Sequence, residues 1–589
     1  MTERADPKIP FRAGVLGALL LLAFIVLLGR LFQMQVLVSG KYRAHAEENR
    51  IRPERVTALR GRIIGRDGML YADNRPSFSV AVVPFEIRRN LAVVDHLADL
   101  IGADRDQLRE RAAKGYARPH EPRAIVPDVD LTVVSIVEEH ALDLPGVLIL
   151  TEPVRVYPGG PAAAHVLGYV GEISDREVDE TKGGALRPGA RVGRAGLESA
   201  YDERLRGRDG FRYVQEDAHG RRLGTLREEE PIPGEDLVIT LDWGLQERAE
   251  SLLAGHEAGT IVALDPEDGE VLLLACSPSF DPNLFSVAVP AAAWDSLSGH
   301  PLHPLLNRSI QSAFPPGSVY KPITAIEGIE QRVVGPETVL LPCFGAWQYG
   351  RRAFRCWKPE GHGALSMRGA IEQSCDVYFY QVGARLDLDR FAAAARVFGL
   401  GARTGIDLPG EKAGLIPDTR YMNERYGKSG WGGGALLNHS IGQGEILTTP
   451  LQIARLYAAL ATGRIVEPHL LHHAAGAEGK EPRRAVSASR PVPLPEEILR
   501  PVREGLIRVV EGERGTGRAA RVPGVPSAGK TGTAQNPHGE DHAWFVAWAP
   551  ANRPRIVLAV IIENAGHGGA VAAPLAGDLL RYYFEREKT

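Results

Sequence analysis

The residues best suited to covalent chemistry lie in the segment FPPGSVYKP, in which Ser318 stands three positions before Lys321. Two prolines before Ser318 end any preceding regular element, and the apolar spacing after Lys321 predicts a helix. Ser318 then lies near a helix amino end, with Lys321 on the same face and within reach of its hydroxyl. A serine becomes a nucleophile when a neighbouring base accepts its proton, and a lysine in suitable surroundings can be that base. An ordinary serine helix cap is the alternative interpretation.

Two other segments carry hydroxyl and ammonium groups in a related pattern. In SAGKTGTAQ, Ser527 and Lys530 repeat the serine–lysine spacing, but the glycines of this segment favour an extended edge strand over a helix. Between the two lysine segments, EQSCDVYFY contains Ser374 and Asp376. The order Ser-x-x-Lys, Ser-x-Asp or Asn, Lys-Thr-Gly is the motif set of serine acyl-transferases that react with β-lactams. The three segments together therefore predict a serine acyl-transfer site.

A separate set of three cysteines and one histidine could hold a metal ion. Its members are Cys343, Cys356, His362 and Cys375. Three thiolates and an imidazole form a closed, tetrahedral zinc site of the structural kind, without the open position that a catalytic zinc needs. A disulfide is the alternative, because an oxidising compartment favours one, but it would leave His362 without a role. The fourth cysteine, Cys276, lies in an apolar run and is predicted to be a buried strand residue.

Regular elements must position these groups. The sequence predicts two β-hairpins for this purpose, at opposite ends of one domain. GTIVALDP and GEVLLLACSP are β-rich apolar runs joined by a turn, and HAWFVAWAP and RIVLAVIIEN repeat the pattern near the carboxyl end. Alanine-rich helical stretches lie between the hairpins, and an amphipathic helix, PLAGDLLRYYFEREK, follows the second hairpin. The pattern predicts a sheet assembled from both ends of a domain, with a helical subdomain inserted between them.

The amino end carries one segment that is apolar enough to cross a membrane. Residues 13–29, AGVLGALLLLAFIVLLG, are uncharged, and the apolar run continues beyond Arg30. About 20 apolar residues span a bilayer, and no small-residue cleavage site follows, so an uncleaved signal anchor is predicted. Basic residues on both sides leave its orientation open. A buried helix of a soluble protein is the alternative interpretation.

The overall composition restricts the architecture and the partners. At 589 residues the chain exceeds a single compact core, and a hydrophobic content of 44% indicates that it folds. The net charge of -4 and the pI near 6.5 provide no overall basic field. Nucleic acid is therefore not expected as a partner.

The chain resembles the class B penicillin-binding proteins, and most of all their elongation-type members. Apart from the three motifs, the likeness extends from about Leu59 to Leu580 through RGRIIGRDG, GRAGLESAYDERLRG, SFDPNLF, SIGQGEILTTPLQIA and DHAWFVAWAP. The resemblance implies a peptidoglycan D,D-transpeptidase that crosslinks stem peptides during cell elongation. It would be held in the inner membrane by a single helix, with the bulk of the chain on the periplasmic side.

The fold that the resemblance implies has three parts beyond a short tail. They are a transmembrane helix, an α+β pedestal, and an α/β penicillin-binding transpeptidase domain whose mainly antiparallel sheet is flanked by helices. The expected bounds are a cytoplasmic tail at 1–12, the signal anchor at 13–36, a pedestal of the dimerisation type at 37–240 and the transpeptidase domain at 241–589.

The resemblance also implies catalytic roles for five side chains. Ser318 would attack the penultimate D-alanine carbonyl of a donor stem pentapeptide, and Lys321 would be the base that activates it. Ser374 would pass a proton to the leaving amine, while Lys530 keeps the local field positive. Asp376 departs from the asparagine that many relatives carry, and its carboxylate favours the charged forms of both lysines. The resting place of the proton among these groups stays open.

The Lys-Thr-Gly segment implies substrate binding. Thr531 and Thr533 would donate hydrogen bonds to the terminal carboxylate of the substrate, and the backbone N–H groups of Ser318 and Thr533 would form the oxyanion hole. Gly532, between the threonines, would let the substrate approach the strand closely. No cofactor is implied for catalysis. Some relatives have a zinc site at the position of the cysteine–histidine set, which would stabilise the second motif.

The implied partners follow from the same resemblance. They are peptidoglycan stem pentapeptides, β-lactams, the membrane, a lipid II polymerase of the shape, elongation, division and sporulation (SEDS) family, and other elongation-complex proteins. Two other functions stay open. A membrane-bound β-lactam sensor would also be acylated, but only about a dozen residues precede the anchor to carry a cytoplasmic output. A non-catalytic scaffold acting through its pedestal would not need the intact motif set.

Overall fold

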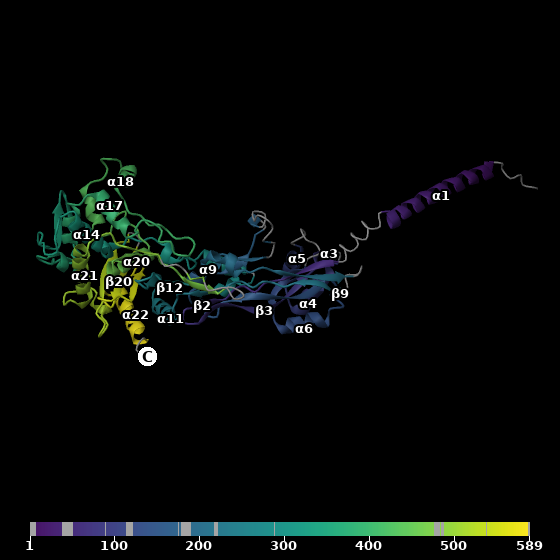
Figure 1. Cartoon of the computed structure of the whole chain (residues 1–589), viewed down its shortest axis with the longest axis horizontal. Coiled ribbons are helices and arrows are strands. Elements are labelled where there is room, and N and C mark those ends of the chain that lie inside the picture. The colour runs from purple at the N-terminus through teal and green to yellow at the C-terminus, as the bar shows by residue number, and fades with distance from the viewer. Residues whose placement is uncertain are drawn as a thin grey trace, which may run out of the picture. The chain divides into compact units, whose positions relative to one another are not determined.

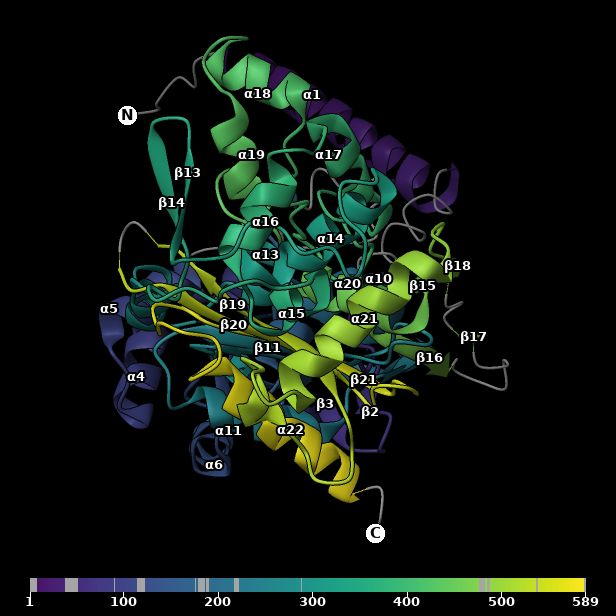
Figure 2. The same ribbon diagram turned by 90° about the vertical axis from the view of Figure 1, so that its left-hand side faces the viewer.

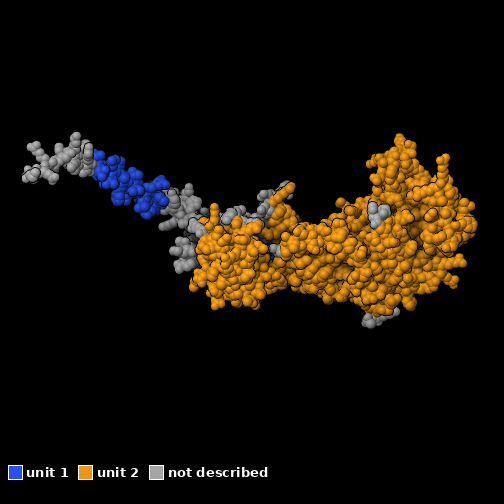
Figure 3. Space-filling view, turned by 180° about the vertical axis from the view of Figure 1, so that it is seen from behind, with its two compact units in different colours: residues 1–58, 208–232 blue, residues 59–207, 233–589 orange. Residues whose placement is uncertain are grey.

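The computed structural model of the chain divides into two compact units, which Figure 3 colours separately. Residues 1–58 and 208–232 form the first unit, and residues 59–207 and 233–589 form the second. The structure describes residues 8–37, 51–88, 90–113, 122–174, 176–177, 186, 190–216, 222–287, 289–475, 483–484, 488–536 and 539–586. The first seven residues of the predicted cytoplasmic tail lie outside this range.

The first unit contains the apolar amino-terminal helix and a small sheet. The helix α1 (Lys8–Phe32) continues as the π-helix η1 (Gln33–Leu37). The segment Gly14–Leu37 is long and apolar enough to cross a membrane, and none of it is buried against the rest of the protein. The sheet is antiparallel, in the order β1 (Ile51–Val56), β8 (Gly210–Glu216), β9 (Arg222–Glu229).

The second unit contains a sheet that joins the pedestal to later parts of the chain. Its strand order is β17-β16-β10-β2-β3-β4, with β5 also paired to β3. The bounds are β2 (Ile63–Gly65), β3 (Leu70–Val82), β4 (Arg123–Val129), β5 (Val147–Val156), β10 (Asp236–Ile239), β16 (Leu471–Ala475) and β17 (Arg483–Arg484). Strand β10 pairs in parallel with β2 and antiparallel with β16. Strands from both sides of residue 240 therefore share one sheet.

Three helices cover one end of this sheet and enclose a separate apolar core, as Figure 1 shows for α4 and α6 beside β3. They are α4 (Ala92–Ile101), α5 (Arg105–Ala113) and α6 (Leu131–Glu139). Alternate residues of β3, such as Val80 and Val82, pack against Leu97 and Val137 in this core. The Asp130 side chain caps α6 by accepting a hydrogen bond of 2.9 Å from the Val133 N–H.

The second sheet of this unit is antiparallel and has the order β12-β11-β21-β20-β19. Its strands are β11 (Gly259–Leu264), β12 (Val271–Ser277), β19 (Ala528–Ala534), β20 (His542–Ala549) and β21 (Ile556–Ile562). Both hairpins that the sequence predicts are present, and β11 pairs with β21, so the two ends of the domain meet in one sheet. The predicted insertion of a helical subdomain between them is confirmed.

Helices cover both faces of this five-stranded sheet (Figure 2). Phe545 and Leu558 point into a core with α11 (Trp243–Leu253) and α22 (Ala572–Arg586). Their strand neighbours Trp544 and Val557 belong to the other core, which contains α20 (Pro450–Thr462). Because successive side chains of a strand alternate between faces, burial of both faces requires the near-continuous apolar runs seen in the sequence.

The inserted subdomain is helical, and one of its helices begins at Lys321, three residues after Ser318. Its helices after Ser318, besides α20, are α14 (Lys321–Glu330), α15 (Met367–Glu372), α16 (Asp376–Gly383), α17 (Leu388–Val397), α18 (Thr419–Tyr426), α19 (Gly433–His439) and α21 (Glu496–Glu511). The remaining elements of the second unit are α3 (Pro84–Ile87), α7 (Ala164–Leu167), β6 (Val170–Glu172), β7 (Arg191–Gly193), α9 (Gly196–Ala200), α10 (Asp202–Leu205), η2 (Pro282–Phe285), α12 (Ala291–Ser298), α13 (Arg308–Gln311), η3 (Gly317–Tyr320), β13 (Ala346–Tyr349), β14 (Arg352–Arg355), β15 (Arg464–Val466), β18 (Ser489–Pro491) and η4 (Arg518–Ala520).

A buried ion cluster around Glu198 holds the pedestal segments together. Glu198 is fully buried in α9, with Oε1 at 2.6 Å from Arg155 Nε and Oε2 at 2.5 Å from Arg60 Nε. Burial opposes ionisation of this carboxyl, but the charges of Arg155 and Arg60 outweigh it and lower the pKa of Glu198. A carboxyl with a lowered folded-state pKa stabilises the fold above its unfolded pKa, and the stabilisation is lost as the pH falls through the folded value.

We expect Glu198→Gln to lower the free energy of unfolding by about 3 kcal/mol, because it leaves Arg155 in the interior without its counter-charge, while Arg60 keeps its ion pair with Asp202. Urea denaturation of the full-length protein in detergent at neutral pH measures the loss. The matched control is Asp99→Asn, which removes the partner of Arg105 in a pair whose side chains are 51% and 58% exposed. The control should change stability little. Equal effects of the two variants would contradict the prediction.

Candidate active site

Ser318 lies at the start of the inserted subdomain, against the edge of the five-stranded sheet. It is half-buried in the single 3-10 turn η3, immediately before α14, so the predicted helix start is confirmed. Gly317 has a φ of +56°, and a Cβ atom there would lie 2.5 Å from Thr533 O. Only glycine satisfies both conditions. The close approach places Ser318 next to β19.

Ser374 occupies the connection between α15 and α16 and has an unusual backbone conformation. Its φ is +56°, a left-handed conformation that costs a non-glycine residue about 1–2 kcal/mol. Its Oγ lies 3.2 Å from Lys321 Nζ and 2.7 Å from Lys530 Nζ. Ammonium groups only donate, so the Ser374 oxygen accepts from both and its own proton is free to be donated elsewhere.

Lys321 is fully buried, and its ammonium group faces the second motif. Its Nζ donates to Ser374 O at 2.7 Å and to Asp376 Oδ1 at 2.8 Å. In the part of the chain that the structure describes, no hydrogen bond joins Lys321 to Ser318 Oγ. Burial raises the pKa of Asp376, while hydrogen bonds from Lys321 and from the Trp357 N–H oppose the rise. Catalytic hydrogen bonds often form only when substrate binds, so this arrangement is compatible with a base at Lys321.

Lys530 approaches Ser374 from the strand side. It is fully buried in β19, and its Nζ also donates to Thr531 O at 2.9 Å. Burial lowers the pKa of Lys530 well below its ordinary value, and the charge of Lys321 lowers it further, against the opposing effect of Asp376. Lys321 and Lys530 therefore both contact the Ser374 hydroxyl, although their surroundings differ.

The rate of acylation is expected to fall as the pH rises through the lowered pKa of Lys530, because deprotonation removes a positive charge beside Ser374. The fall should begin below the ordinary lysine pKa of about 10.4. The measurement is the acylation rate with benzylpenicillin as a function of pH. Arginine stays protonated throughout, so Lys530→Arg should abolish the alkaline fall. If the alkaline fall persists in Lys530→Arg, a group other than Lys530 causes it.

The Lys-Thr-Gly residues form an edge strand, as the sequence predicts. Strand β19 is the last in the sheet order and pairs on one side with β20. Its other side faces η3, and Thr533 O accepts a hydrogen bond of 3.2 Å from Gln443 Nε2. A strand edge that no other strand covers can bind an extended peptide as an additional strand. Gln443 was not predicted as a site residue, although it lies within the SIGQGEI segment that carries the family likeness.

The four residues of the cysteine–histidine set converge in the structure. They are Cys343, Cys356, His362 and Cys375, and their ligand atoms all lie within 4.8 Å of one another. His362 Nδ1 is 3.6 Å from Cys343 Sγ and 3.5 Å from Cys356 Sγ. The four cysteines of the chain are free. Three sulfur atoms and one imidazole nitrogen at this separation fit a tetrahedral zinc ion, whose ligands lie about 2.0–2.3 Å from the metal. Cys276 is buried in β12, as predicted.

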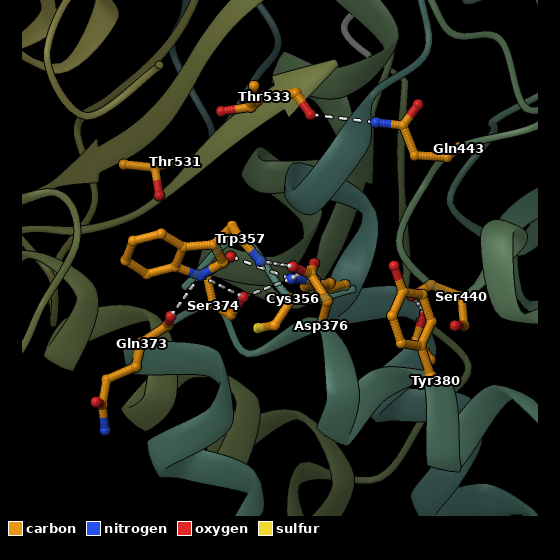
Figure 4. A network of polar contacts seen from close by, with 12 residues as sticks. Cys356, Trp357, Gln373, Ser374, Asp376, Tyr380, Ser440, Gln443, Thr531 and Thr533 are labelled. Carbon is orange, nitrogen blue, oxygen red and sulfur yellow. Dashed lines mark hydrogen bonds and ion pairs between the residues drawn. The ribbon is translucent and has the colours of Figure 1, made fainter. Parts of the chain in front are cut away.

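Trp357 connects the cysteine–histidine set to the second motif and was not identified from the sequence. Its backbone N–H donates to Asp376 Oδ2 at 2.9 Å. Its indole Nε1–H donates to Ser374 O at 3.1 Å and to Gln373 O at 3.2 Å (Figure 4). The neighbouring Cys356 belongs to the cysteine–histidine set. A metal ion that holds Cys356 in place would therefore also hold Trp357 and the Ser374 turn that Trp357 contacts.

Comparisons with known proteins agree with the geometry. Residues 259–581 match the penicillin-binding protein transpeptidase domain, and residues 55–239 match the penicillin-binding protein dimerisation domain. A relative from Acinetobacter baumannii, named peptidoglycan D,D-transpeptidase MrdA, is 36% identical over 97% of this chain and 87% of its own. The chain belongs to the penicillin-binding protein family, which confirms the resemblance predicted from the motifs.

Two solved structures extend the comparison to the fold. The penicillin-binding protein of Helicobacter pylori, in a complex with MreC, is 26% identical and superimposes with a TM-score of 0.80, covering 91% of this chain and all of that one. A second structure, described as showing structural coordination of polymerization and crosslinking by a peptidoglycan synthase complex, is 31% identical. It has a TM-score of 0.72 and covers 98% of each chain. This chain therefore combines a pedestal with a transpeptidase domain, as its family does.

Proposed function

We propose that the chain is a peptidoglycan D,D-transpeptidase that crosslinks stem peptides during cell elongation through an acyl-enzyme on Ser318. The observation that carries the proposal is the Ser374 hydroxyl, which lies between the side-chain nitrogens of Lys321 and Lys530 beside β19, the last strand of the sheet. The family membership and the naming of the Acinetobacter baumannii relative as a peptidoglycan D,D-transpeptidase support it.

The acylation half of the reaction assigns a role to each group. Ser318 Oγ attacks the carbonyl of the penultimate D-alanine, and Lys321 accepts the hydroxyl proton in its neutral amine form, because an ammonium group cannot accept one. The backbone N–H groups of Ser318 and Thr533 stabilise the oxyanion of the tetrahedral intermediate. The peptide C–N bond then breaks, and Ser374 gives its proton to the departing D-alanine amine and is reprotonated from the lysines. Thr531 and Thr533, with Gly532 between them, bind the terminal carboxylate.

The second half transfers the acyl group to another stem peptide. An acceptor amine attacks the ester carbonyl and loses a proton to the same base, and the C–O bond to Ser318 breaks. The new amide is the crosslink, and Ser318 regains its proton. No cofactor takes part in either half.

We propose a structural zinc ion in the cysteine–histidine set. The convergence of three thiols and the His362 imidazole, with their ligand atoms within 4.8 Å of one another, supports it. The expected result is about one zinc per chain by metal analysis of the protein purified without chelator. Cys343→Ser should lose the metal, whereas Cys276→Ser should keep it. A mapped disulfide among these cysteines, with no zinc, would favour the alternative.

The location and the partners complete the proposal. α1 anchors the chain in the inner membrane, and the transpeptidase domain at 241–589 and the pedestal at 37–240 lie on the periplasmic side. Glycan polymerisation falls to a SEDS-family lipid II polymerase within the elongation complex. The described peptidoglycan synthase complex and the complex with MreC, both of related proteins, support partners of this kind.

The test is crosslinking by the full-length protein in liposomes that also contain lipid II and a SEDS-family polymerase. Digestion of the product should release crosslinked muropeptides, and free D-alanine should appear in equal amount. A control without polymerase should give no crosslinked polymer. Acylation by penicillin without crosslinking would favour a β-lactam sensor, and the lack of both reactions in folded protein would favour a scaffold.

A further inference from the structure

Two residues outside the motif set lie directly behind the two substrate-binding threonines of β19. Thr516 Oγ1 is 2.7 Å from Thr531 Oγ1, and His567 Nδ1 is 3.4 Å from Thr533 Oγ1. Thr516 lies in the loop between α21 and η4, and His567 lies just before α22. Each strand threonine thus has its own polar neighbour, supplied by a different segment.

The backbone around His567 is closely packed against β19 and β20. A Cβ atom at Gly568 would lie 1.9 Å from Trp544 O and 2.4 Å from Gly532 O, so no other residue fits there without a backbone shift. The His567 carbonyl accepts hydrogen bonds from the N–H groups of Ala570 and Val571, at 3.0 and 3.1 Å, at the start of α22. These contacts fix the backbone that carries the exposed His567 side chain beside the substrate edge.

The number of hydrogens that each group can donate determines the direction of these hydrogen bonds when a carboxylate binds. A threonine hydroxyl has one hydrogen to donate, and a carboxylate only accepts. Thr531 and Thr533 must therefore both point their hydrogens at the substrate, and any bond to a neighbour must be one that they accept. Thr516 can donate through its hydroxyl, and His567 can donate through Nδ1–H.

We propose that Thr516 and His567 are positioning residues for recognition of the donor's terminal carboxylate. Thr516 donates to Thr531 and His567 donates to Thr533, so that both strand hydroxyls are oriented toward the carboxylate before it arrives. The inference rests on the proposed acyl-transfer function. It adds that Thr516 and His567, which do not touch the reacting atoms, increase the selectivity for a donor with a carboxylate.

The test compares benzylpenicillin with its methyl ester, which lacks the carboxylate charge, as acylating agents of the full-length protein in detergent. Thr516→Val removes the donating hydroxyl and keeps the shape, and His567→Phe removes the donating nitrogen. Each is expected to lower the acylation rate of the acid about tenfold, the usual loss for a hydrogen bond that serves a charged group. The rate of the ester should stay within about twofold of the unchanged protein, so that the acid-to-ester ratio falls.

Controls separate this inference from general damage and from failure of the function itself. Thr516→Ser keeps a hydroxyl and should restore the acid-to-ester ratio. Equal losses with acid and ester would overturn the inference, since misfolding affects both probes. An unchanged ratio in Thr516→Val would also overturn it, because Thr516 would then be only an acceptor. If the unchanged protein forms no adduct with either probe, the proposed function fails first.

Discussion

Replacement of Ser318 by alanine is expected to abolish covalent labelling by benzylpenicillin, while the rest of the protein stays folded. The hydroxyl is the only group that the proposed mechanism uses to form the acyl-enzyme, so the loss should exceed about a thousandfold. Intact-mass measurement of the full-length chain in detergent, followed by peptide mapping, detects the adduct and its position. The truncation is small and the side chain is only half-buried, so the thermal midpoint should change little.

The chain supplies a matched control for this experiment. Ser527 precedes Lys530 with the same spacing that Ser318 has to Lys321, but it is fully buried and its backbone N–H donates to Glu511. Ser527→Ala should therefore still be labelled at Ser318. An adduct that survives Ser318→Ala, or one that disappears in Ser527→Ala with the fold intact, would contradict the assignment of the nucleophile.

Removal of the amine at Lys321 is expected to have the second-largest effect. Lys321→Met should slow acylation about a thousandfold, within the range of general-base contributions. Lys321→Arg should not restore the rate, because a guanidinium keeps its proton. The measurement is the second-order rate of adduct formation with benzylpenicillin, together with the free energy of unfolding of each variant.

A control for folding is needed because Lys321 is the ion-pair partner of Asp376, at 2.8 Å in the interior. Lys321→Met leaves this carboxylate uncompensated, which destabilises the protein. Asp376→Asn in the same chain removes the charge and keeps an oxygen for the Trp357 N–H. The double variant should regain stability but not acylation. Recovery of both would show that Lys321 acts only through the ion pair.

Local sequence patterns were sufficient to predict the elements that carry the site. The runs in β11, β12, β20 and β21 are apolar because both faces of their sheet are buried, and this signal needs no knowledge of the partner strands. The amphipathic spacing of α22 and the paired prolines before Ser318 are equally local. The motif order predicted the acyl-transfer chemistry, because the spacing of a few residues specifies a nucleophile and its base on one turn.

Other residues of the site could not be predicted from the sequence immediately around them. Trp357, Gln443, Thr516 and His567 reach the motifs from separate segments, and their contacts depend on hydrogen bonds between positions 15 to 90 residues apart. The sharing of one sheet by β2, β10 and β16 is likewise non-local. Pairing of this kind depends on loop closure and packing, which periodicity does not encode.

Residue type and short spacing were enough to predict the class of the protein, the order of its parts and the candidate catalytic and metal-binding residues. How these groups face one another follows from long-range packing, which the sequence pattern does not show. The positive φ of Ser374 places its hydroxyl between Lys321 and Lys530, although more than fifty residues separate Ser374 from either lysine in the chain. That conformation persists because the surrounding contacts outweigh its local cost.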